Sequence, residues 1–303
     1  MSINLLNIYI KTLVDNVNIE NIPKYLDIVF DGGAFNGGMG FGTALYLKEL
    51  EKRKITKISR VSGCSIGSII ALSFLLDFKY DINKIFISVC KNFKNTFNLS
   101  VFKDHIKKII YDNLTDDLSF LNNKLYITYY DAVNYKHIMI CNYKNRDHLI
   151  DCLMRSCHIP YITMPTMMYD EKYIDGVTPY IFRDGLNNVL FVNMITIKNY
   201  KYIFNVGKEN NVNHRMMIGI NDINKFFVNK KSDMCSYYNG WSWISVFMLR
   251  MRIMIVFIIL WIVNNSKKIK HIIPPYFLEN SVVKNINMLL KELYNDLMYK
   301  IIN

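Results

Sequence analysis

The sequence predicts an α/β protein with a mostly parallel central sheet. Residues 26–30 form a short apolar run that leads directly into a glycine-rich segment, residues 31–42. A second apolar run, residues 58–61, leads into another glycine-containing turn and then into an apolar helical segment, residues 68–78. The first 80 residues thus read as strand, turn and helix, repeated. Right-handed crossovers between such units imply parallel strands.

The later elements follow from hydrophobic periodicity. Helical spacing with polar breaks and period-2 alternation predict the following helices and strands in chain order: helix at 43–54, helices within 81–118, strands at 124–131 and 136–141, helix at 147–157, and strands at 172–174 and 189–194. We therefore expect an N-terminal extension over residues 1–24, the α/β domain over 25–205, and a mainly helical C-terminal region over 206–303. That last region would cover the core or contact a membrane.

Composition narrows the classes of partner. The chain has 303 residues, of which 51% are hydrophobic and 20% charged, and this balance excludes general disorder. A net charge of +12 would suit nucleic acid or an anionic lipid surface. The lysines are scattered, however, and no basic cluster with interleaved aromatic residues is present. We therefore expect no nucleic-acid partner.

The cysteines and the N-terminus indicate an intracellular setting, either cytoplasmic or peripheral to a membrane. The six cysteines contain no C-x-x-C pair and no histidine partner at zinc spacing, so we expect neither a metal site nor a disulfide framework. The first apolar run is interrupted by Asn4 and Asn7 and lacks a basic start and a cleavage site, so no signal peptide is expected.

Residues 241–263 are the membrane candidate of the sequence. Their uninterrupted apolar part, residues 253–263, is shorter than the roughly 20 residues needed to cross a bilayer. A longer span would place Arg250 and Arg252 near its middle, at about 2.5–3.5 kcal/mol each. A buried core helix and an interfacial helix therefore compete with, and are favoured over, a spanning one.

The sequence Gly63-Cys64-Ser65-Ile66-Gly67 follows an apolar strand and has the form G-x-S-x-G. This pattern is typical of a nucleophile elbow, a strained strand-to-helix turn that exposes a serine Oγ. Gly63 and Gly67 are needed because the turn leaves no room for a Cβ on either side. Ser65 is therefore the candidate nucleophile.

Two further segments could complete an acyl-transfer site. Asp31-Gly32-Gly33-Ala34-Phe35-Asn36-Gly37 follows the first strand, where converging backbone amides could stabilise an oxyanion. A dinucleotide-binding turn, with Glu51 about 20 residues on, and a purely structural turn are alternatives, whereas the missing Gly-Lys-Ser/Thr ending excludes a Walker loop. Asp175-Gly176 ends a short strand and offers either a catalytic carboxylate or a turn aspartate.

Together these segments resemble the patatin-like phospholipase family over residues 25–193. That family combines a D-G-G-G-x-R/K-G oxyanion loop, a G-x-S-x-G nucleophile and a D-G-G/A aspartate. Residues 155–160 and 44–50 also resemble family segments. The resemblance implies a three-layer α/β/α fold, with Ser65 and Asp175 as a catalytic dyad and the amides of Gly32, Gly33 and Ala34 as the oxyanion hole. Asn36, Gly37, Gly63, Gly67 and Gly176 support the motifs.

Three positions depart from the family pattern. Ala34 replaces the third loop glycine and disfavours a positive φ, Asn36 replaces the basic residue, and Val177 replaces the second glycine after the aspartate. A non-catalytic, membrane-associated lipid-binding relative is therefore an alternative. So is an esterase with a Ser65–Asp175–His271 triad, although that fold normally places several strands before its elbow. His158 lies near the predicted site but is expected to be satisfied or exposed.

The resemblance implies two-step acyl transfer on a phospholipid or another acyl-ester lipid at a membrane surface, without cofactor or metal. Asp175 would accept the Ser65 proton, the alkoxide would attack the ester, and water would release the acyl-enzyme. Because a carboxylate is a weak base at its ordinary pKa, we expect burial to raise the pKa of Asp175.

Overall fold

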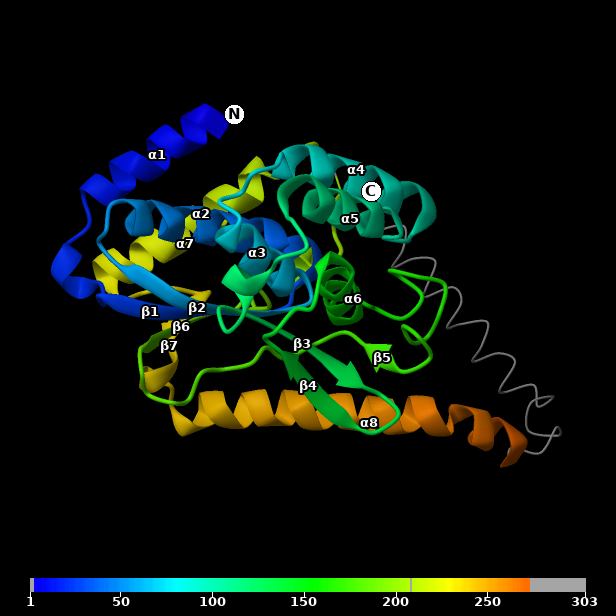
Figure 1. Ribbon diagram of the computed structural model, residues 1–303. Helices are drawn as coiled ribbons and strands as arrows, with labels where there is room; N and C mark the ends of the chain where they lie inside the picture. Colours follow the sequence, from blue (N-terminus) through cyan, green and yellow to red (C-terminus); the bar gives the residue numbers. More distant parts are fainter. Residues whose placement is uncertain (1–2, 208, 273–303) are drawn as a thin grey trace.

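A seven-stranded sheet organises the computed structural model, which describes residues 3–207 and 209–272 (Figure 1). The strand order is β4-β3-β2-β1-β6-β7, with β5 paired to β3. The strands are β1 (Tyr25–Phe30), β2 (Lys57–Cys64), β3 (Leu125–Asp131), β4 (Lys136–Ile140), β5 (Tyr173–Ile174), β6 (Asn188–Val192) and β7 (Cys235–Tyr237). The central pairs β3-β2, β2-β1 and β1-β6 are parallel, and the pairs of β4, β5 and β7 are antiparallel. The predicted mostly parallel sheet is confirmed.

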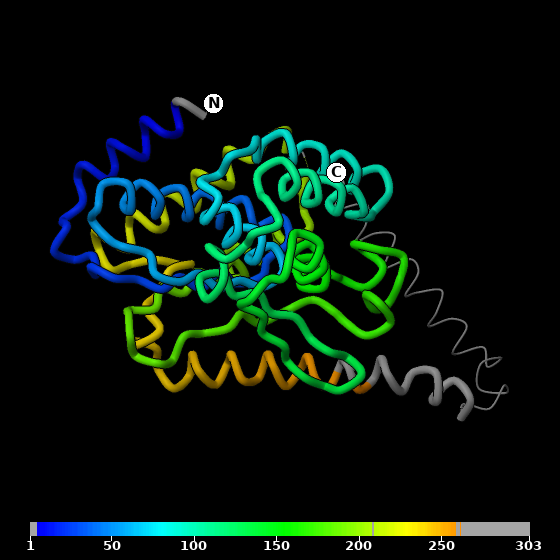
Figure 2. The backbone as a smooth tube through the Cα atoms, in the orientation of Figure 1, coloured from blue at the N-terminus to red at the C-terminus, as the bar shows by residue number. Residues whose placement is uncertain are grey.

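Helices cover both faces of this sheet. They are α1 (Ile3–Asp15), α2 (Gly37–Lys52), α3 (Ile66–Leu75), α4 (Ile82–Thr96), α5 (Val101–Asn113), α6 (Arg146–Ser156), α7 (Asn213–Asn229) and α8 (Trp243–Ile272). Helices α1, α2, α3 and α7 lie on one side, whereas α8 runs along the opposite side (Figure 1). The backbone trace shows the same three layers (Figure 2).

Side-chain alternation along β1 accounts for the layers. Ile28 and Phe30 are buried in the main cluster with α2 and α3, whereas Val29 points into a second cluster that contains Leu249 of α8. Successive side chains of a strand face opposite sides, so a strand apolar at every position needs a cover on both. A continuous apolar run such as β1 is therefore typical of a doubly covered sheet.

The turn after β1 is shorter than the glycine-rich segment, residues 31–42, that predicts it. A turn was expected through residue 42, but α2 already begins at Gly37. The later glycines serve helix packing: a Cβ on Gly42 would lie 2.0 Å from the carbonyl oxygen of Met216 on α7, and one on Gly219 would lie 1.9 Å from that of Met39. Helices α2 and α7 can approach this closely only through glycine.

Segments outside residues 25–205 are also part of the main core. Leu6, Ile10 and Val14 of α1 are buried in the same hydrophobic cluster as β1, and so is Ile220 of α7. Strand β7 adds an antiparallel edge to β6. The periodicity argument assigned no individual element to α1, α7 or β7, because the packing of each depends on partners far away in the chain. Helix α7 nevertheless lies in the C-terminal region that was expected to be mainly helical.

Helix α8 contains residues 243–263 of the apolar segment 241–263. It buries Leu249 and Val256 against the sheet side and exposes Trp243, Phe247 and Ile258. Among the described residues, no helix meets the length and apolarity needed to cross a membrane. One face of the helix is therefore packed in the protein, as expected for a core helix, and the other face is exposed.

Candidate active site

Ser65 occupies a strained turn between β2 and α3. Its backbone has φ 51° and ψ −134°, a left-handed conformation that a serine adopts only where its surroundings force it. The flanking glycines are required by contact distances: a Cβ on Gly67 would lie 2.4 Å from the carbonyl oxygen of Asp31, and one on Gly63 would lie 2.2 Å from that of Gly67. The turn has the geometry of the predicted nucleophile elbow.

Residues 156–158 hold both halves of the predicted dyad. Ser156 Oγ accepts a hydrogen bond from the amide of Ser65 at 2.9 Å and donates one to the carbonyl of Thr128 at 2.7 Å. The amide of Asp175 donates to the carbonyl of His158 at 3.0 Å, and the amide of Gly176 donates to that of Ser156 at 3.1 Å. One short segment at the C-terminal end of α6 thus fixes the elbow and the aspartate relative to each other.

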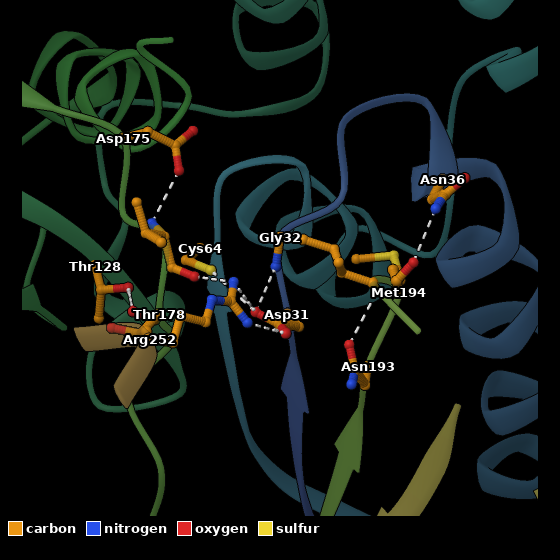
Figure 3. Close-up of polar contacts among 12 residues, drawn as sticks. Asp31, Gly32, Asn36, Cys64, Thr128, Asp175, Thr178, Asn193, Met194 and Arg252 are labelled. Atoms are coloured by element: carbon orange, nitrogen blue, oxygen red, sulfur yellow. Dashed lines mark hydrogen bonds and ion pairs between the residues drawn. The ribbon is translucent and has the colours of Figure 1, made fainter. Parts of the chain in front are cut away.

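The carboxylate of Asp175 has one occupied oxygen and one open oxygen. Oδ1 accepts a hydrogen bond from the amide of Val177 at 2.8 Å (Figure 3). Oδ2 is buried and has no partner within hydrogen-bond distance in the described chain. Burial raises the pKa of Asp175 to about 6, and the neighbouring Ser65 hydroxyl and Arg252 guanidinium oppose part of that rise. A carboxylate with a raised pKa and a free oxygen near a serine suits a general base.

The oxyanion loop, residues 31–36, offers fewer free amides than the motif implies. The amide of Gly32 donates to Asp31 Oδ1 at 2.8 Å. Within the described part of the chain, the amides of Gly33 and Ala34 have no protein acceptor. Ala34 adopts φ 46°, so it retains the left-handed conformation that glycine adopts freely. Gly33 and Ala34 are therefore the available donors of the three predicted.

Asn36, which replaces the family's basic residue, is held by a buried arginine. Asn36 Nδ2 donates to the carbonyls of Met194 at 2.9 Å and Asn199 at 3.0 Å. Its Oδ1 accepts from Nη1 of Arg215 on α7 at 3.2 Å. Arg215 is 1% exposed and forms an ion pair with Glu209. A positive charge therefore stands beside the loop, but it comes from a different helix.

The opposite end of the oxyanion loop contacts Arg252 of α8. Arg252 Nη1 lies 2.6 Å from Asp31 Oδ2, and Nη2 lies 2.9 Å from Oδ1, a bidentate pair (Figure 3). Nη2 also donates to the carbonyl of Val177, two residues after Asp175. Sequence reasoning missed this residue. The feature that could have revealed it is an arginine within an apolar segment, which the sequence argument treats as a cost of membrane insertion.

An apolar pocket opens beside Ser65. Its empty space is about 830 Å³ when the open mouth is counted. Ser65, Ala34 and Cys157 are among the lining residues, and the remaining lining is mostly apolar. Half of these remaining residues come from α3, α4 and α5, including Ile69, Ile85, Phe86, Val89, Phe102 and Ile106. Such a lining suits a hydrocarbon chain better than a polar ligand.

The position of the alternative triad's histidine is far from the predicted dyad, whereas His158 contacts Asp175 through its backbone carbonyl. Position 271 lies on α8, 19 residues beyond Arg252, or roughly 28 Å along the helix at 1.5 Å per residue. His158 is buried, and its Nδ1 lies 3.4 Å from Thr163 Oγ1, so it is not an exposed histidine. The described residues contain no cluster of side chains suited to a metal ion.

Comparison with known proteins agrees with the motifs. Two mouse proteins are each 25% identical to this chain: an omega-hydroxyceramide transacylase, over 49% of this chain and 26% of its own length, and the 1-acylglycerol-3-phosphate O-acyltransferase Pnpla3, over 48% and 38%. The chain thus spans well under half the length of these relatives. VipD from Legionella pneumophila is a structural neighbour with a TM-score of 0.35 and 15% identity, covering 56% of this chain and 50% of its own.

The family model for patatin-like phospholipases matches residues 28–184, slightly more than half of the chain. The matched range contains the oxyanion loop, the elbow of Ser65 and the aspartate loop of Asp175. The chain belongs to the patatin-like phospholipase family.

Proposed function

We propose that this chain is a lipid acyl hydrolase of the phospholipase A or lysophospholipase type, with Ser65 and Asp175 as its catalytic dyad. The observation that carries the proposal is the open, buried Oδ2 of Asp175 beside the strained Ser65, at the wall of an apolar pocket. A buried, unpaired carboxylate oxygen is costly to a protein, and a catalytic role is a reason to retain one.

The proposed reaction follows from the contacts at the site. Ionised Asp175 accepts the proton of Ser65, and the serine oxygen attacks the ester carbonyl. The free amides of Gly33 and Ala34 stabilise the negative charge that develops on the carbonyl oxygen. The alcohol leaves with a proton, an acyl-enzyme remains on Ser65, and water releases the fatty acid. The amide of Val177 donates a hydrogen bond to Asp175 Oδ1 and so orients the carboxylate, which leaves Oδ2 to accept the proton.

The departures from the family motifs do not argue against turnover. Ala34 retains φ 46° in spite of its methyl group, and Arg215 supplies a charge beside Asn36. Val177 adopts φ 42°, and the amide of Thr178 donates across it to the carbonyl of Gly176 as in a γ-turn.

We propose a lipid surface as the partner of the outer face of α8. The exposed side chains on this helix include Trp243, Phe247, Met248 and Ile258, and Arg250 is exposed among them. Exposed aromatic and aliphatic residues with an arginine are typical of an interfacial helix, and the net charge of +12 favours anionic lipid.

Labelling with a fluorophosphonate, together with fatty-acid release from mixed phospholipid vesicles, tests the proposal. We expect wild-type protein and the exposed-serine control Ser119→Ala to be labelled and active, and Ser65→Ala and Asp175→Ala to be neither. Absence of labelling in folded wild-type protein would support a lipid-binding role instead. Adding a lysolipid acceptor distinguishes hydrolysis from acyl transfer, because transfer yields a new ester in place of free fatty acid.

A further inference from the structure

We propose that Arg252 is a positioning residue that couples the oxyanion loop to the aspartate loop, so that α8 is an integral part of the active site. The proposal rests on the proposed acyl-transfer function and deepens it. It concerns a residue that lies outside the matched family range and that no motif includes.

The contacts of Arg252 join the two loops that the reaction needs. Its bidentate pair with Asp31 fixes the orientation of that carboxylate, which accepts a hydrogen bond from the amide of Gly32. The guanidinium therefore acts on the start of the oxyanion loop. The same guanidinium holds the carbonyl of Val177, whose amide binds Asp175 Oδ1. A displacement of Arg252 would therefore move both the oxyanion donors and the base.

The setting explains why an arginine is needed. Asp31 is 0% exposed, and a buried carboxylate requires a partner of opposite charge with satisfied hydrogen bonds. Arginine offers several planar donors in fixed directions, enough for both carboxylate oxygens and a third acceptor. Lysine would keep the charge but lose the fork geometry.

Charge at this position also reaches Asp175. The charged groups that act on the Asp175 carboxyl are Arg252 from α8 and Asp31 after β1. The neighbouring thiols of Cys64 at the end of β2 and Cys157 after α6 are neutral, because burial raises the pKa of each. Arg252 lowers the pKa of Asp175, whereas Asp31 raises it. Arg252→Gln should therefore raise that pKa above about 6 and move the acidic limb of the rate profile to higher pH. Asp31→Asn should move the same limb to lower pH.

The catalytic test measures kcat/KM against pH with a short soluble ester, so that vesicle binding plays no part. We expect Arg252→Gln to lower kcat/KM about a hundredfold, because the reacting groups are misplaced, and to move the acidic limb of the profile to higher pH. Arg252→Lys should keep the wild-type limb while losing about tenfold. Lys11→Gln, which removes an exposed charge on α1, should match wild type. Limb positions that stay unchanged in both Arg252→Gln and Asp31→Asn would overturn the proposal.

Hydrogen–deuterium exchange provides a readout that does not depend on turnover. Arg252→Gln should increase amide exchange in both residues 31–36 and residues 175–178, with α2 and α3 unaffected. Faster exchange confined to α8 would instead identify Arg252 as a simple helix anchor and overturn the proposal. If wild-type protein shows no Ser65-dependent hydrolysis, the proposed function fails, and the exchange result alone decides whether the coupling exists.

Discussion

Arg215 on α7 donates a hydrogen bond to Oδ1 of Asn36, 179 residues earlier in the chain, at 3.2 Å. This contact places a buried cation at the position beside the oxyanion loop where the family has a basic residue. It also means that the family motif cannot be restored here by a single substitution.

Replacing Asn36 by lysine should damage the protein rather than improve it. The new ammonium would be buried against Arg215, and an uncompensated buried charge costs about 3–5 kcal/mol. We expect Asn36→Lys to lower the free energy of unfolding in urea by that order, and the added change Arg215→Gln to recover part of the loss. Asn229→Lys, at an exposed site on the same helix as Arg215, is the control. A stable and more active Asn36→Lys variant would contradict this account.

Glycine at two left-handed positions should stabilise the fold. Ala34 and Val177 have φ 46° and φ 42°, and a left-handed conformation costs an L-residue about 1–2 kcal/mol. Ala34→Gly and Val177→Gly should each relieve this strain and raise the free energy of unfolding. The expected gain is only about 0.5–1 kcal/mol, because the greater chain entropy that glycine loses on folding offsets part of it. Ala71→Gly, inside α3, should instead lower it. Thermal melts of the three variants decide the sign.

Asp175→Asn should abolish turnover but stabilise the protein at neutral pH. Because burial raises the pKa of this carboxyl to about 6, its contribution to stability is full below the unfolded pKa near 4 and is lost as pH rises through 6. A shift of this size corresponds to about 3 kcal/mol at neutral pH. The Tm advantage of the variant should therefore vanish near pH 4. A constant advantage at every pH would show that Asp175 is not the titrating group.

The same pKa sets the pH dependence of the reaction. Only ionised Asp175 can accept the Ser65 proton, so wild-type kcat/KM should rise with pH and level off above about 6. Stopped assays with a soluble ester between pH 4 and pH 9 measure this limb. A rate that is flat down to pH 4 would exclude Asp175 as the base.

A larger side chain on the pocket side of α4 should shorten the preferred acyl chain. Ile85 lines the pocket beside Ser65, whereas Ile87 on the same helix does not line it and is 42% exposed. Ile85→Trp should cut kcat/KM for long-chain esters by about tenfold or more and spare short esters, because only a long chain reaches the filled space. Ile87→Trp is the matched control. Equal losses on short and long esters would mean that the pocket does not hold the chain.

Polar substitution on the outer face of α8 should separate lipid-surface binding from chemistry. The triple variant Trp243→Ser, Phe247→Ser, Ile258→Ser removes exposed apolar area and leaves Arg252 in place. We expect weaker sedimentation with anionic vesicles and lower activity on them, with unchanged hydrolysis of a soluble ester. Ile8→Ser, at a position on α1 that is 60% exposed, controls for the general loss of apolar surface. Deleting α8 is not equivalent, since it also removes Arg252.

The sequence alone determined the sheet class, the elbow of Ser65 and the aspartate loop of Asp175, because these features depend on neighbouring residues. The alternation of buried strand positions and the turn residues are local constraints, and each leaves a pattern within about ten residues. Only the tertiary structure revealed the roles of Arg215 and Arg252. Each reaches the oxyanion loop from about 180 to 220 residues away, and such ion and hydrogen-bond pairs leave no periodic signal. The sequence thus predicted the candidate reacting groups, and folding decided which charges lie beside them.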